Sequence, residues 1–237
     1  MIRQPLINCI RSKSTSISSL LSYNDLESYF KYAKTTDLRT DSTAFIGTSY
    51  ELLVLRELTS KFGIYESLHM GGSYDNGIDI QGKWNLNKYR PNKEINEQII
   101  PMSINGRKIK PILERKSSIV DVLIQCKNYS KKITAKEIRE LSGIFNFNVP
   151  STKKNKTFSI LASPNYLTPQ GISQINKVDI PIIYIQFSKL KQISNNDKYD
   201  LQCYKGGHLL NFYSNDYARA LLMGTNIFFE VQKFIDA

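Results

Sequence analysis

The second half of the chain alternates between strand patterns and helix patterns, and this alternation constrains the fold more than any other feature. A helix pattern follows the first strand, where Thr134 and Glu137 have the spacing of a capping box, and another begins at Thr168. Strands joined through a crossover helix run parallel, so the last two strands should pair in parallel. The predicted strands are residues 119–126, 157–163 and 180–187, and a further helix is predicted over residues 216–224.

The first half of the chain predicts helices followed by antiparallel strands. A short helix pattern over residues 25–33 precedes a longer one that Gly63 ends, because glycine is a common helix stop. Strand patterns follow at residues 63–70 and 78–84. With the strand at 119–126 they complete an order of helix, three antiparallel strands, helix, strand, helix and strand. We therefore predict an α/β fold with a mixed central sheet flanked by helices.

Residues 85–118 interrupt this order and are predicted to be a basic insertion. They have no sustained period, contain three prolines, and include a turn signal at Asn105 and Gly106 that favours a short hairpin. An insertion of this length suits either a binding loop or a flexible segment, and the sequence leaves both readings open.

The N-terminal residues have the composition of a mitochondrial targeting leader. Arg3, Arg11 and Lys13 are basic, serines are frequent, and no acidic residue comes before Asp25. We expect a leader over residues 1–23, a single domain over 24–237, and residence in the mitochondrial matrix. A frayed terminus without a targeting role is the alternative.

The charge balance predicts a polyanionic partner. The 237 residues hold 32 lysines and arginines against 21 acidic residues, a formal net charge of +11. No apolar run approaches the ~18 residues of a membrane span. DNA is the first expected partner and RNA the second, while a homodimer is left open. A solvated lysine-rich surface is the alternative reading of the predicted nucleic-acid contacts, which are Lys131, Lys132, Lys136, Arg107, Lys108, Arg115 and Lys116.

The three cysteines give no sign of a zinc site or a disulfide framework. Cys9, Cys126 and Cys203 are widely separated and lack the CxxC spacing of a metal knuckle. We expect free thiols.

Four polar residues occupy positions where an apolar residue would be expected. Glu51 falls one helical turn before Leu55 on a predicted buried face, and Asp79 interrupts a strand. Gln125 and Lys127 are two residues apart on a strand and should project to the same side. The alternatives are that Glu51 is a rim residue and that Asp79 caps a turn.

Together these positions resemble the PD-(D/E)XK nuclease superfamily, and within it the Mrr-like restriction endonuclease branch. The resemblance covers about residues 44–187. It includes a G-x-x-[FY]-E element at Gly47, Tyr50 and Glu51, and an I-R-E-L-x-G helix at residues 138–143. The whole chain also resembles the fungal mitochondrial proteins named for being required for respiratory growth.

The nuclease resemblance implies a restriction-endonuclease-like αβββαβ core and a Mg²⁺- or Mn²⁺-dependent endonuclease that acts on DNA in mitochondrial genome maintenance. Asp79, Glu51, the Gln125 side chain and the Cys126 main-chain carbonyl would hold the metal. Lys127 would contact the attacking water or the scissile phosphate. Gln125 supplies a neutral oxygen, as is common in the Mrr-like branch, so metal binding should be weaker than with an acidic residue in this motif.

Two alternatives to a DNA endonuclease remain at the level of sequence. One is an inactive nuclease-fold protein that binds nucleic acid or a protein partner in mitochondrial gene expression. The other is an RNA-processing nuclease, because phosphate contacts look alike on either polymer.

Overall fold

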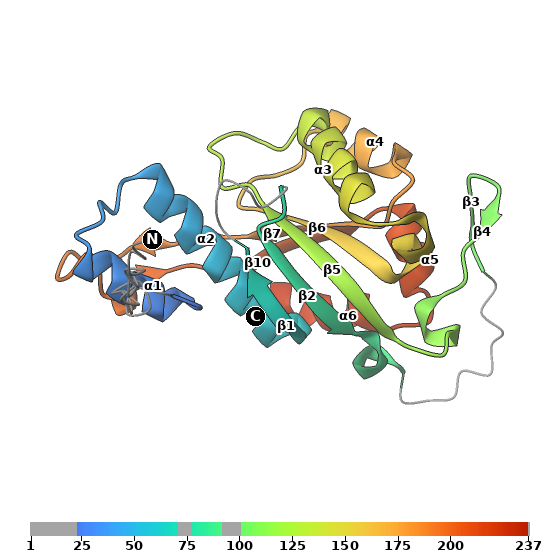
Figure 1. The fold of residues 1–237 in the computed structure, drawn as a ribbon, viewed down its shortest axis with the longest axis horizontal. Helices are drawn as coiled ribbons and strands as arrows, with labels where there is room; N and C mark the ends of the chain where they lie inside the picture. The colour runs from blue at the N-terminus through green and yellow to red at the C-terminus, as the bar shows by residue number, and fades with distance from the viewer. Residues whose placement is uncertain (1–22, 71–76, 92–100, 237) are drawn as a thin grey trace, which may run out of the picture.

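The computed structural model describes residues 23–70, 77–91 and 101–236, and Figure 1 shows their arrangement. The predicted leader lies outside these residues, apart from Tyr23. The helices are α1 (Leu26–Thr35), α2 (Thr43–Glu57), α3 (Ala135–Asn148), α4 (Pro169–Lys177), α5 (Asp216–Leu222) and α6 (Ile227–Ile235). The strands are β1 (Ile64–His69), β2 (Ile80–Asn85), β3 (Ser103–Ile104), β4 (Arg107–Lys108), β5 (Ile119–Cys126), β6 (Thr157–Ser163), β7 (Ile182–Phe187), β8 (Lys191–Gln192), β9 (Tyr204–Lys205) and β10 (Leu209–Ser214).

A mixed six-stranded sheet forms the centre, with strand order β1-β2-β5-β6-β7-β10. The pairs β1–β2 and β2–β5 are antiparallel, which confirms the predicted run of three antiparallel strands. β5–β6 and β6–β7 are parallel, as the crossover helices α3 and α4 require, and β10 pairs antiparallel with β7. The predicted class, an α/β protein with a mixed central sheet, is confirmed.

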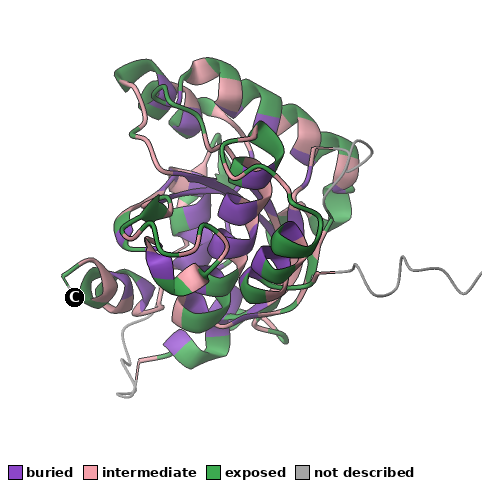
Figure 2. Ribbon diagram, turned by 90° about the vertical axis from the view of Figure 1, so that its left-hand side faces the viewer, coloured by how far each residue is buried: buried purple, intermediate pink, exposed green. Residues whose placement is uncertain are grey.

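The parallel strands β6 and β7 are buried on both faces, as expected for parallel strands, whereas β1 and β2 are only partly covered. On one face, Leu141 and Phe145 of α3 pack with Leu161 of β6. On the other, Leu53 of α2 belongs to a larger core that includes Ile124 of β5. Figure 1 shows α3 and α4 over one side of the sheet, and Figure 2 shows the buried residues gathered between the exposed outer sides of the helices.

Strand β5 alternates between these two cores in the predicted way. Val120, Val122 and Ile124 face the larger core, while Leu123 packs against the α3 core. Gln125 has the same parity as Leu123 and lies beneath α3 beside Leu141 and Phe145. The predicted division of the strand into two faces is therefore confirmed.

Helix α2 ends in a π-helical turn at Leu58–Phe62, followed by Gly63 in the left-handed conformation at φ 65°. The predicted stop at Gly63 is confirmed, since glycine adopts this conformation without a Cβ penalty. The carbonyl of Phe62 accepts hydrogen bonds from Trp84 Nε1 at 3.0 Å and Tyr89 Oη at 3.1 Å. These bonds tie the end of the helix to β2 and to the turn Leu86–Tyr89 that follows it.

The insertion contains the predicted hairpin but is not simply a flexible loop. Asn105 and Gly106 both have positive φ, 48° and 75°, which is the geometry of a type I′ turn between β3 and β4. Ile109, Ile112 and Leu113 at its base are buried in the larger core. Residues 92–100 lie outside the described part. The described base of the insertion is thus packed, whereas the hairpin tip is exposed.

Strand β10 and helix α6 were not among the predicted elements. Between β10 and α5, the buried side chain of Asn215 joins three segments. Its Oδ1 accepts hydrogen bonds from the main-chain N–H of Ile182 at 3.1 Å and Ala218 at 2.9 Å, while its Nδ2 donates to the carbonyls of Ile175 and Ile180. One amide therefore caps α5 and anchors β7 at the same time.

Within the described residues, no helix is both long enough and apolar enough to cross a membrane.

Candidate functional site

Asp79 lies immediately before β2, where its backbone and side chain hold three strand ends together. Its N–H donates to the carbonyl of Ile124 at 3.0 Å, and its carbonyl accepts from the N–H of Met70 at 2.8 Å. Oδ2 accepts from the main-chain N–H of Cys126 at 2.5 Å. A charge-assisted bond of this kind fixes the carboxylate at the end of β5.

Glu51 projects from α2 at the rim of the buried face, as the alternative reading of its position stated. Its Oε2 lies 2.7 Å from His69 Nε2 at the end of β1, and the side chains are 21% and 10% exposed respectively. The ring of His69 also lies 6.3 Å from that of Tyr23, measured between centroids. The carboxylate that α2 buries more deeply is Glu57, which pairs with Arg56 and Lys61.

Gln125 is buried beneath α3, and the nitrogen of its side-chain amide forms a hydrogen bond. Nε2 donates to the carbonyl of Gly77 at 3.1 Å, which connects β5 to the segment that leads to Asp79. Oε1 is buried, and it finds no hydrogen-bond partner among the described residues. An amide oxygen in this condition costs free energy unless something else binds it.

Lys127 follows β5 and lies on the α3 side, in keeping with the predicted shared face of Gln125 and Lys127. Its Nζ lies 3.3 Å from Glu140 Oε1 and 5.8 Å from the centre of the Tyr129 ring. Burial lowers the pKa of Lys127, but Tyr129 and Glu140 outweigh it, and the pKa is raised above its ordinary value. Lys127 therefore carries a positive charge at neutral pH.

Three charged groups act on the Cys126 thiol at the end of β5. Burial raises the pKa of the thiol well above its usual value, the negative charges of Asp79 and Glu51 raise it further, and Lys127 lowers it. Each of the three charged groups therefore lies within electrostatic range of the same sulfur atom. Two carboxylates and one ammonium thus influence the carboxyl end of β5, and Asp79 is bonded there directly to the main-chain N–H of Cys126.

The donor set suits a hard cation only in part. Carboxylate and amide oxygens are the ligands that Mg²⁺ and Mn²⁺ prefer, and the buried Oε1 of Gln125 needs a partner. Across residues 23–70, 77–91 and 101–236, however, no three side chains from His, Cys, Asp and Glu come close enough to hold a metal. A metal would depend on Asp79 and Glu51 together with neutral oxygens, which is the predicted set. The role of the Cys126 carbonyl stays a prediction.

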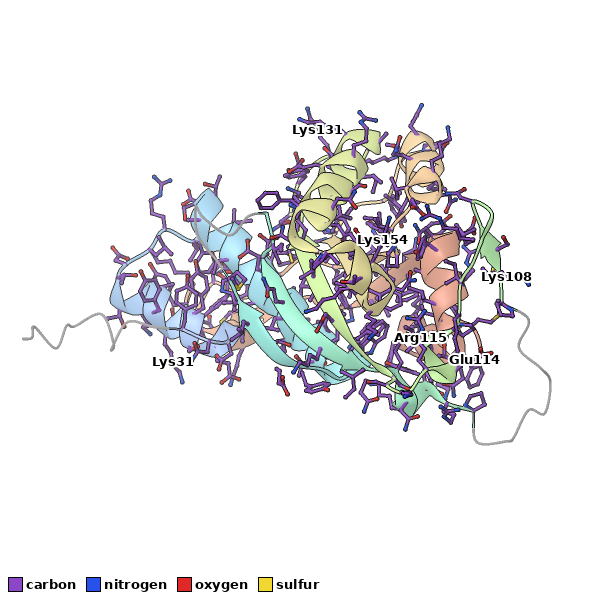
Figure 3. All side chains as sticks on the ribbon, turned by 45° about the vertical axis from the view of Figure 1, so that its right-hand side comes forward. Lys31, Lys108, Glu114, Arg115, Lys131 and Lys154 are labelled. Atoms are coloured by element: carbon purple, nitrogen blue, oxygen red, sulfur yellow. The ribbon has the colours of Figure 1, made fainter. Side chains whose placement is uncertain are left out.

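The predicted nucleic-acid contacts fall into two groups at opposite ends of the sheet. Figure 3 shows Lys131 above the start of α3, whereas Lys108 and Arg115 of the insertion lie far from it. The first group follows β5 in the chain and therefore lies near Lys127. The second group belongs to the insertion, which precedes β5. Only the first group, Lys131, Lys132 and Lys136, is placed around the candidate site, and all three are exposed.

Arg115 differs from the other predicted contacts because its guanidinium is engaged within the protein. It donates to the main-chain carbonyl of Lys110 and, at 2.7 Å, to that of Asn155. Burial lowers the pKa of Arg115. Its contacts make it a bridge between segments, which leaves Arg107, Lys108 and Lys116 as the exposed members of the second group.

His69 and Glu140 are site residues that sequence reasoning missed. Each acts through a residue that was predicted, since His69 binds Glu51 and Glu140 binds Lys127. The partners of each pair are separated by 18 and 13 residues. No helical or strand period links such positions, so the pairs emerge only from the fold.

The fold and the site together define a mixed α/β protein that gathers carboxylates, a buried amide and a lysine at the ends of two adjacent strands. Residues 42–222 match the family described as required for respiratory growth protein 7, so the chain belongs to that family. No solved structure matches the chain.

Its relatives include the mitochondrial required for respiratory growth protein 7 of Zygosaccharomyces rouxii, which is 39% identical over 78% of this chain and 80% of its own length. The protein of the same name from Vanderwaltozyma polyspora is 40% identical over 78% of each chain. That from Saccharomyces cerevisiae strain S288c is 34% identical over 83% of this chain and 85% of its own. These names confirm that the protein is mitochondrial, and its predicted residence in the matrix stays a prediction.

Proposed function

We propose that this protein is a Mg²⁺- or Mn²⁺-dependent endonuclease that acts on DNA and supports mitochondrial genome maintenance and respiratory growth. The observation that carries the proposal is the hydrogen bond that holds the Asp79 carboxylate on the Cys126 N–H, between Gln125 and Lys127 at the end of β5, with the charge of Glu51 also acting on Cys126. Opposite charges gathered at strand ends, with an unsatisfied amide oxygen nearby, suit the recognition of a metal and a phosphate.

Each residue has a separate task in this proposal. A bound metal ion would supply Lewis-acid polarisation of the phosphate and a more acidic water. Asp79 and Glu51 would hold the metal, with the Gln125 oxygen and the Cys126 carbonyl. Lys127 is protonated, so it would stabilise charge that develops on the phosphate and would not act as a base.

The second candidate is a protein that binds nucleic acid or a protein partner without cutting, and specific observations favour it. Gln125 is neutral, and Glu51 is already bound to His69. Both features reduce the negative charge available to a cation. RNA cleavage stands beside DNA cleavage as a variant of the first candidate, because the site contacts would be the same.

The deciding experiment measures nicking and linearisation of supercoiled plasmid, and cleavage of RNA, by the full chain in Mg²⁺, in Mn²⁺ and in chelator. Asp79→Asn is the matched variant, since an asparagine oxygen can still accept the bond from Cys126 while the charge is lost. We expect metal-dependent cleavage that Asp79→Asn abolishes while a gel shift remains. If the protein binds DNA or RNA but cuts neither, the second candidate is correct.

His69 provides a finer prediction about the same site. A hydrogen-bonded partner that orients a metal ligand typically contributes 10–100-fold to affinity. His69→Ala should therefore weaken Mn²⁺ binding about tenfold, measured by calorimetry, while His69→Gln restores part of the loss. His208→Ala is the control, because His208 is the only other histidine of the chain and lies at the opposite edge of the sheet. Equal metal affinity in His69→Ala and the parent would reject the positioning role.

A further inference from the structure

Two basic segments that are far apart in the sequence form one surface at the end of the molecule away from the candidate site. Arg115 joins them, since it donates to Lys110 on its own segment and to the carbonyl of Asn155 on the other. Tyr217 Oη also donates to Asn155 Oδ1 at 2.6 Å. The segments are the described end of the insertion, residues 101–116, and the 3-10 turn Ser151–Lys156.

We call this the remote basic surface and define it by its exposed cations, which are Arg107, Lys108, Lys110, Lys116, Lys153 and Lys156. Within the part of the chain that the structure describes, none of the six forms an ion pair. Asp179 nearby is already paired with Lys154 at 3.0 Å, which leaves Glu114 as the exposed acid on these segments. Six exposed cations therefore share these segments with one exposed acid, so the surface is strongly positive.

The chemistry of the surface favours a phosphate backbone in water. None of the exposed large hydrophobic side chains belongs to residues 101–116 or 151–156, and a membrane-bound surface normally inserts such side chains. Ile109, Ile112 and Leu113 anchor the segment in the core, so its cations are held in place. A held array of lysines and arginines suits the regular charge of a nucleic acid.

The distance between the remote basic surface and the candidate site sets a minimum length for a duplex that contacts both. Lys116 comes just before β5 and Lys127 just after it, and this strand of eight residues spans roughly 26 Å at about 3.3 Å per residue. Nucleic acid rises about 3.4 Å per nucleotide along a duplex strand, so the gap corresponds to about eight base pairs. A shorter duplex cannot touch both ends.

We propose that the remote basic surface is a second backbone contact for the nucleic acid that the candidate site acts on, so that full affinity requires a duplex longer than about eight base pairs. The proposal rests on the proposed function for the identity of the polymer. In this proposal the insertion holds the nucleic acid, and the candidate site at the end of β5 carries out the reaction.

The test measures the affinity of Asp79→Asn without metal for duplexes of about 6 and about 24 base pairs, on either side of the length that the helical rise sets. A second variant combines Asp79→Asn with Lys108→Glu, Lys116→Glu and Lys156→Glu. The control adds Lys31→Glu, Lys191→Glu and Lys205→Glu, which are equally exposed but lie on α1, β8 and β9. Both sets change the net charge by the same amount.

We expect the first set to weaken binding of the long duplex at least tenfold and to lower its salt slope by about 3, since each phosphate contact contributes about 0.9. The short duplex and the control set should show little of this loss. Equal losses on both lengths, or the same loss in the control set, would overturn the proposal, as would binding to anionic vesicles in place of DNA. Because no cleavage is measured, a protein that never cuts but keeps the length dependence would refute only the nuclease activity.

Discussion

Replacing Lys127 with methionine should lower the cleavage rate about 10²- to 10³-fold and leave DNA affinity nearly unchanged. A fixed donor that stabilises charge in the transition state typically contributes this much. Methionine keeps most of the apolar stem but lacks the ammonium, which Tyr129 and Glu140 keep protonated through a raised pKa. The rate would be measured as single-turnover nicking of plasmid with the variant in excess.

The fold should survive this change, which makes the rate interpretable. The partner Glu140 is 44% exposed, so water can solvate its carboxylate once the lysine is gone, and a pair of this kind contributes little to stability. Glu140→Gln is the control, because it removes the pairing charge and leaves Lys127 in place. A methionine variant that cuts at the parental rate would show that Lys127 serves only to bind Glu140.

The sequence indicated the fold because its strongest patterns are local. The alternating faces of β5, the capping box at Thr134 and the stop at Gly63 each follow from backbone geometry over a few residues, and each is present. Strand β10 was missed because it is an edge strand that is only partly buried, so its pattern of apolar residues is weak. Helix α6 is different, because the sequence does carry its helical pattern, with Ile227 and Val231 one turn apart on its buried side.

The candidate site was predicted less completely because its parts meet through the fold. Asp79, Gln125 and Lys127 could be found, since they break apolar patterns within a strand or at its end. The contact between Glu51 and His69 joins α2 to β1, and no spacing rule predicts it. The basic residues show the same limit, because charge marked them as candidate nucleic-acid contacts but could not show that β5 separates them into two groups.

Substitutions of Gln125 can distinguish a metal ligand from a residue that serves only in packing. Gln125→Glu should lower the stability of the metal-free protein but strengthen its binding of metal. Without metal, the variant loses the bond from Nε2 to Gly77 and puts a carboxyl group into an apolar space beneath α3. Burying an unpaired polar group of this kind costs roughly 3 kcal/mol of unfolding free energy. The measurement is denaturant unfolding in chelator, compared with Gln125→Leu, which removes the same bond without adding charge.

Addition of Mn²⁺ should then recover much of the lost stability in Gln125→Glu but none in Gln125→Leu. An acidic ligand adds negative charge to a site that otherwise has Asp79 and Glu51, and the affinity of such sites rises with the number of charged ligands. Ligand binding to the folded state alone stabilises it in proportion to that affinity. If Mn²⁺ leaves both variants equally unstable, Gln125 is not a ligand, and its amide serves only to fasten the segment before Asp79 to strand β5.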